Sequence, residues 1–399
     1  MTSSARPLTD LDFCSGSRIE ELNKLMEELE RLEDITLKGK EVLQNCVQAK
    51  DYIFSLLGHI QPIPNLKSLL LLSGGLCSGS LDVSPIDLGS PSPFPSPSIS
   101  YTLLVPILSL SSYENLTQSS PCHFSVPYSL WDPPPPQPPS KESFVTPHTV
   151  SLWFSHSILS AASSFPPSPH LCLEKADIWG NCASVLLSTP SGLLRFDIVP
   201  VVEVQGWPPG TQYLEEWVIK EGDFLRHFHL LPWGANDQWR VGFPGVEFSM
   251  RRSLYPTLSR VLRACIAILG PFLLEEGEPG PYIVWATLLH ACERLPTGFL
   301  CREQNVALCL LGLLDELSLS FLRGSCPNPF LSGCDLLKGS CKGPCLARWV
   351  SEIRAKPVTC LRKVVREAKG AIRGGEREER EEKEEIMETA EKGSTCYPS

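Results

Sequence analysis

A Gly-Ser pair at Gly79 and Ser80 is the first feature of this sequence that could take part in chemistry. It ends the stretch LLSGGLCSGS, residues 71–80, in which an apolar run gives way to glycines. Glycine has no Cβ and tolerates positive φ, so the backbone N–H groups of such a turn can approach a triphosphate. The same residues also form ordinary surface turns, and other parts of the chain must decide between the two interpretations.

Histidine and cysteine supply two further candidate sites, both for a metal ion. His227 and His229 lie two residues apart on one face of an expected strand, but the sequence places no acid or cysteine next to them, which favours a structural role. A tetrahedral zinc site needs four ligands, and only the last two of the C-terminal cysteines have a close spacing, which favours separate buried thiols. These four cysteines are Cys326, Cys334, Cys341 and Cys345.

The elements that must position these residues follow from hydrophobic periodicity. Apolar residues at helical spacing predict helices over 17–33 and over the segment that ends near Gly58. Residues 99–110 read as a strand, 183–204 as two strands joined by a Pro-Ser-Gly turn, and 148–164 as a helix. Four further helices are expected, at 256–274, 281–295, 303–323 and 344–372. The sequence therefore predicts an α+β fold that ends in a helical subdomain.

Composition divides the chain into five predicted parts. Pro and Ser dominate 118–147, which is expected to be a disordered insert, and charge without an apolar stripe dominates 373–399, which is expected to be a disordered tail. The tetraproline run in the insert suits either a stiff spacer or a ligand of an SH3 or WW domain. The folded parts are expected at 1–117, 148–255 and 256–372.

Charge and hydropathy limit the classes of partner and the location. A net charge of -10 over 399 residues argues against general nucleic-acid binding, and the basic run between 348 and 373 suits a solvated helix face or a peripheral membrane contact better. The sequence has no recognisable export signal, so most of its sixteen cysteines are expected to be reduced thiols in an intracellular protein. The best candidate for a membrane span, 257–274, contains Arg260 and Arg263, so no transmembrane helix is expected in this sequence.

Several stretches together resemble the Mab-21 family of nucleotidyltransferase-fold proteins, which includes cyclic GMP-AMP synthase. The matching stretches are SGGLCSGSLD, ISYTLLVPILSL, LLRFDIVPVVEVQGWPPG, DQWRVGFPGVEFSM and NVALCLLGLLDEL. The resemblance implies a mixed sheet with N-terminal helices, followed by a helical subdomain. In active members a Gly-Ser turn and three carboxylates hold two Mg²⁺ ions that bind the triphosphate.

By this resemblance the three acidic positions are occupied by Ser100, Thr102 and Asp197, so two of the three carboxylates are absent. Neutral hydroxyls cannot replace the hydration shell of Mg²⁺, so Gly79 and Ser80 are interpreted as part of a degenerate site. Asp197 is either a relic of a metal ligand or an acid anchored by a neighbour such as Arg195. Neither interpretation calls for a resident cofactor.

The expected function is that of a pseudo-nucleotidyltransferase, a non-catalytic signalling adaptor that binds other proteins. The part of the family that the chain resembles most implies association with the cytokine receptor common beta chain in apoptotic signalling, with possible contact at the plasma membrane or mitochondria. The alternative is a metal-dependent nucleotidyltransferase that makes a nucleotide second messenger.

Overall fold

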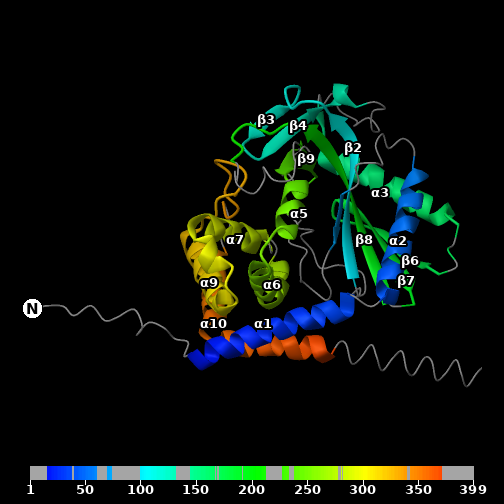
Figure 1. Ribbon diagram of the computed structural model, residues 1–399. Helices are drawn as coiled ribbons and strands as arrows, with labels where there is room; N and C mark the ends of the chain where they lie inside the picture. Colours follow the sequence, from blue (N-terminus) through cyan, green and yellow to red (C-terminus); the bar gives the residue numbers. More distant parts are fainter. Residues whose placement is uncertain are drawn as a thin grey trace, which may run out of the picture.

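The computed structural model describes residues 16–37, 40–60, 70–73, 99–131, 144–166, 168, 170–190, 192–212, 227–232, 238–276, 280, 282–338 and 342–370. The architecture is α+β, as the sequence predicts: a mixed sheet lies beside a group of helices (Figure 1). The strands are β1 (Leu70–Ser73), β2 (Ile99–Leu110), β3 (Thr117–Ser120), β4 (His123–Pro127), β5 (Phe144–Val145), β6 (Cys172–Trp179), β7 (Cys182–Thr189), β8 (Gly192–Gln205), β9 (His227–Leu231) and β10 (Trp239–Gly242).

The described helices are α1 (Gly16–Leu37), α2 (Lys40–Gly58), η3 (Tyr128–Leu130), α3 (Pro147–Ser164), α5 (Pro244–Arg252), α6 (Pro256–Glu276), α7 (Tyr282–Arg294), α8 (Thr297–Leu300), η5 (Glu303–Asn305), α9 (Val306–Arg323) and α10 (Gly343–Ala355). Helices α1 and α2 precede the described strands, η3 and α3 lie among them, and the remaining described helices follow β10. Residues 357–370 are also helical.

Strand β8 organises the sheet. It pairs in parallel with β2, and on its other edge it pairs antiparallel with β7 at its start and with β9 at its end. The sheet runs β1-β2-β8-β9-β10-β4-β3, with β6 attached to β7 and β5 to β4. The predicted Pro-Ser-Gly hairpin joins β7 to β8, and Gly192 takes a φ of 118° there, which favours glycine. Because β8 is paired along both edges, the sheet fixes the direction in which each of its side chains points.

Alternation along the strands gives the sheet two different faces. Phe196 and Ile198 of β8 point to the main core, where α3 contributes Phe154 and packs on β6, β7 and β8. The neighbouring residues Val199 and Val201 point the other way, into a smaller cluster. That cluster includes Leu104, Cys182 and Leu231 and is covered by Phe248 of α5. Asp197 and Glu203 belong by alternation to this second face.

The helical group is built around α9, which contacts α1, α6, α7 and α10. The single helix expected over 344–372 is wrong in one respect, because it is broken at Lys356, whose φ of -133° and ψ of 49° are not helical. Pro357 follows, and proline disfavours the helical conformation of the residue before it while suiting the first position of a new helix. The second helical run, 357–370, then lies beside α1 (Figure 1).

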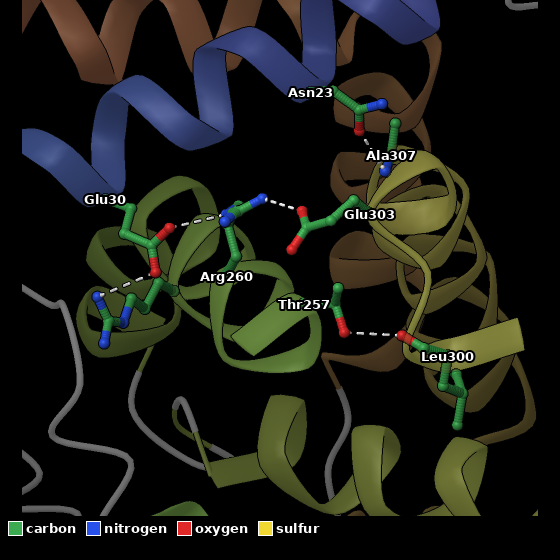
Figure 2. A network of polar contacts seen from close by, with 8 residues as sticks. Asn23, Glu30, Thr257, Arg260, Leu300, Glu303 and Ala307 are labelled. Carbon is green, nitrogen blue, oxygen red and sulfur yellow. Dashed lines mark hydrogen bonds and ion pairs between the residues drawn. The ribbon is translucent and has the colours of Figure 1, made fainter. Parts of the chain in front are cut away.

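Helix α1 is held to the helical group by polar contacts (Figure 2). Arg260 of α6 donates to Glu30 of α1 at 2.8 Å and to Glu303 at 2.6 Å. Asn23 of α1 accepts a hydrogen bond from the Ala307 backbone N–H at 2.8 Å. The first N–H groups of a helix lack partners within that helix, so Asn23 acts as a cap for α9 supplied by another element. The N-terminal helix is therefore part of the helical group rather than of the sheet.

The boundaries of the predicted disordered insert, 118–147, need correction. Most of β3 and all of β4, η3 and β5 lie within it, and Phe124, Trp131 and Val145 are buried. Trp239 of β10 donates through its indole nitrogen to the Val145 carbonyl at 3.1 Å. Residues 132–143, with the tetraproline run, lie outside the described residues. The average composition of 118–147 is rich in Pro and Ser, so it gave no sign of the short strands, whose apolar residues are part of the core.

Candidate functional site

The parallel pairing of β2 and β8 brings together two of the positions named in the degenerate nucleotide site. Thr102 lies opposite Asp197 in the register, and Ser100 lies opposite Arg195. Asp197 is 1% exposed and Thr102 is equally buried. Gly79 and Ser80 lie outside the described residues. The structure therefore places the hydroxyl and the carboxylate next to each other, away from water.

Both carboxylate oxygens of Asp197 have partners. Ser184 of β7 donates its hydroxyl hydrogen to Oδ1, and the Arg195 guanidinium lies 3.1 Å from Oδ2. A Mg²⁺ ion would have to displace these groups and would find no second or third carboxylate among Ser100, Thr102 and Ser184. This geometry fits the interpretation of Asp197 as an acid anchored by Arg195. Sequence reasoning missed Ser184, because its position opposite Asp197 depends on the β7–β8 register.

The second face of the sheet also carries three residues that could bind a metal ion, Glu203, His227 and His229, here called the His–Glu cluster. Their ligand atoms all lie within 4.8 Å of one another. His229 Nε2 is 3.9 Å from Glu203 Oε2, and the two imidazole centroids are 5.2 Å apart. The expectation that no acid lies near the histidines is wrong, because β8 and β9 pair Glu203 directly with His229.

Burial makes His229 a neutral imidazole. The side chain is 2% exposed, and burial, together with the nearby His227, lowers its pKa to about 3. Its Nδ1 atom has no hydrogen-bond partner in the described part of the chain. Because buried polar atoms are usually hydrogen-bonded, this nitrogen is unusual.

The cysteines of the candidate zinc site separate into different surroundings. Cys326 is buried 4.0 Å from Thr287, and Cys334 hydrogen-bonds to Cys122, next to the turn between β3 and β4. Cys345 is exposed, and Cys341 lies outside the described residues. Within the ranges that the structure describes, none of them joins a group of three metal-ligating side chains.

Neighbouring groups lower the pKa of the Cys122 thiol below its usual value. The hydrogen bond from Cys334 contributes most to this shift, and His123 and Ser120 add to it. The same contact raises the pKa of the Cys334 thiol. The contact therefore favours the thiolate form at Cys122 and opposes it at Cys334.

A buried acid joins α5 to α7. Glu247 is 2% exposed, accepts a hydrogen bond from the Tyr282 hydroxyl at 3.0 Å and lies 3.6 Å from the Arg251 guanidinium. Burial raises the pKa of Glu247 to about 7, although Arg251, Tyr282 and Arg240 oppose the shift. Sequence reasoning did not single out this residue, because one acid in a short helix gives no local signal of burial.

Most of the basic run in the C-terminal helices is engaged in ion pairs within the chain. Arg354 pairs with Asp315 of α9, and Arg362 and Lys369 pair with Glu21 and Glu28 of α1. Two more pairs lie within the helices themselves, Arg348 with Glu352 and Lys363 with Glu367. This helical surface therefore carries alternating charges, which is unlike the continuous basic patch of a nucleic-acid interface.

One described helix is long and apolar enough to cross a membrane, by length and composition alone. It spans Glu303–Arg323, with a mean hydropathy of 1.6, and half of that window is buried inside the protein. Sequence reasoning considered a different segment, 257–274, which forms α6. Burial at this level is also typical of a core helix in a soluble protein.

No family model matches the chain. Two relatives, both named transmembrane protein 102, match nearly all of it. The protein from Bos taurus is 30% identical over 487 aligned residues, covering 93% of this chain and 94% of the relative. The protein from Mus musculus is 29% identical over 483 aligned residues, with the same coverage. At this identity and coverage, the chain belongs to the transmembrane protein 102 family.

Proposed function

We propose that this protein is a non-catalytic signalling adaptor whose body is a pseudo-nucleotidyltransferase. The observation that carries the proposal is the state of Asp197, which is buried and bound through both oxygens to Ser184 and Arg195. Thr102 stands opposite it, where a second acid would be needed. Phosphoryl transfer requires cations to neutralise the charge that develops on the transferred group. The only carboxylate available to bind such cations among Ser100, Thr102 and Asp197 is that of Asp197, and it is already bound to Ser184 and Arg195.

The test is an assay for second-messenger synthesis. The purified chain is incubated with ATP, GTP and either Mg²⁺ or Mn²⁺, with and without double-stranded DNA or RNA. No cyclic dinucleotide is expected in any arm. The alternative, a metal-dependent nucleotidyltransferase, predicts product that disappears in Asp197→Asn and persists in Asp177→Asn, a control at an exposed acid of β6.

The partners of the adaptor are proposed to be proteins. The likeness to transmembrane protein 102 suggests the cytokine receptor common beta chain as a partner and a role in apoptotic signalling. The tetraproline run in 132–143 matches the ligands of SH3 and WW domains. Affinity purification of the full chain and of a variant lacking 132–143 separates the two modes. Receptor capture is expected from both proteins, and capture of an SH3 or WW protein only from the full chain.

Membrane association is proposed to be peripheral, from the cytoplasmic side of the plasma membrane or of mitochondria. The relatives are named transmembrane proteins, but the spanning candidate contains α9, which contacts α1, α6, α7 and α10. Inserting it into a bilayer would expose the apolar faces of those four helices to water, which opposes insertion. Alkaline carbonate should therefore release the protein from membranes. Retention in the pellet would instead favour insertion of 303–323.

A further inference from the structure

Two paired strands build the His–Glu cluster. Glu203 of β8 stands opposite His229 of β9, and Gln205 stands opposite His227. Residues opposite each other in an antiparallel pair lie on one face with Cβ atoms about 5 Å apart, and the residue two positions along lies within reach of a long side chain. Three potential ligands, one carboxylate and two imidazoles, thus lie together on two paired strands.

The unsatisfied nitrogen of His229 indicates what the cluster lacks. Its Nδ1 is buried without a hydrogen-bond partner among the described residues, and its Nε2 is 3.9 Å from Glu203 Oε2. That second distance is too long for a hydrogen bond. A buried imidazole in this state carries a desolvation cost that a bound cation would offset.

The chemistry of the three groups selects the class of cation. Two imidazoles and one carboxylate are typical ligands of zinc and the neighbouring divalent transition metals, whereas Mg²⁺ and Ca²⁺ prefer oxygen ligands. We propose that Glu203, His227 and His229 bind a divalent transition metal ion of the zinc class.

Only small side-chain movements are needed to close the site. Ligand atoms around tetrahedral zinc are about 3.3 Å apart, given metal–ligand distances of about 2.0–2.1 Å. The cluster atoms are separated by at most 4.8 Å, so the widest pair must approach by about 1.5 Å on binding. Glu203 is 17% exposed, and its flexible side chain can supply that movement. Three protein ligands leave the fourth position open to water or to a group of a partner.

This site is separate from the degenerate nucleotide site. Asp197 and Glu203 lie on the same face of β8 but six residues apart, which is about 20 Å along a strand. The metal proposal therefore does not rest on the proposed adaptor function, and either can fail without the other.

The experiment uses the full chain, stripped with a chelator and then supplied with Zn²⁺. Metal content after gel filtration gives the stoichiometry, and competition with a chromogenic chelator gives the affinity. Zinc X-ray absorption identifies the ligand atoms, since nitrogen and oxygen lie at about 2.0–2.1 Å and sulfur at about 2.3 Å. The variants are His227→Gln and Glu203→Gln, because His229 is buried and its replacement can affect folding. His156→Gln, at an exposed residue of α3, is the matched control.

The wild type and His156→Gln should bind one equivalent of zinc through nitrogen and oxygen alone. His227→Gln and Glu203→Gln should bind about 100-fold more weakly or worse, since even loss of an outer-shell partner costs about 10–100-fold. Circular dichroism establishes that each variant is folded. A sulfur shell would assign the ion to cysteines and overturn the proposal. So would absence of binding to the wild type, or equal binding by both site variants.

Discussion

Replacing Asp197 by Asn tests whether this carboxylate stabilises the folded protein. Asparagine keeps the shape and can still accept the hydrogen bond from Ser184, so the change removes chiefly the charge that lies 3.1 Å from Arg195. Removing one partner of a buried ion pair costs about 3–5 kcal/mol. Arg195 is 13% exposed, which allows some hydration, so the low end applies and we expect a loss of about 3 kcal/mol in the free energy of unfolding.

The assay is urea unfolding followed by tryptophan fluorescence, for Asp197→Asn, Arg195→Met and the double variant. If the two side chains stabilise each other, the double variant loses little more than either single one, with a coupling energy of about 1–3 kcal/mol. Asp177→Asn is the control, because its partner Lys175 is 42% exposed, and exposed pairs contribute about 0–1 kcal/mol. A loss of stability in Asp197→Asn as small as in that control would refute the reasoning, since the Asp197 carboxylate would then contribute no more to stability than an exposed acid.

Three further expectations follow from burial. Glu247 has a raised pKa of about 7 in the folded state, so between about pH 4.5 and 7 the folded protein holds a proton on Glu247 that the unfolded chain has lost. The free energy of unfolding should therefore fall by about 3 kcal/mol as the pH rises through this range. Urea unfolding of Glu247→Gln should show no such fall. Gly343→Ala would place a Cβ 2.5 Å from the Phe321 carbonyl oxygen and should lower the melting temperature, whereas Gly312→Ala, in open space within α9, should raise it. Deleting 118–147 should abolish cooperative thermal unfolding, because it removes β4, which pairs with β10; an unchanged transition would restore the sequence-based expectation of a disordered insert.

The sequence predicted the elements whose periodicity is strong and whose limits are marked by turns. Strand β2, the β7–β8 hairpin and helices α6, α7 and α9 lie close to their expected positions. Each of them combines a clear apolar pattern with turn residues or a proline at its ends, and both signals are local.

What the sequence could not predict depends on contacts between distant residues. The amphipathic pattern of α1 shows that one face is buried but not that the partner is α6, whose Arg260 lies 230 residues from Glu30. In the same way, the residues between Glu203 and His229 do not indicate the register in which β8 and β9 pair. The acid of the His–Glu cluster could therefore not be assigned from the sequence. Of the two polar partners of Asp197, the sequence indicated Arg195, which is two residues away. It could not indicate Ser184, whose position depends on the pairing of β7 with β8.

The docking of α1 has a consequence for the order of events during synthesis. Its partners α6 and α9 and the helical run 357–370 all come from the last part of the chain. At about 5–20 residues per second, the ribosome needs roughly 10–50 s to make the 230 residues between Glu30 and Arg260. Throughout that interval the apolar side of α1 has no native partner in the helical group. The nascent chain is therefore expected to need a chaperone at its first helix, and products that terminate early should be recognised by that uncovered helix and degraded.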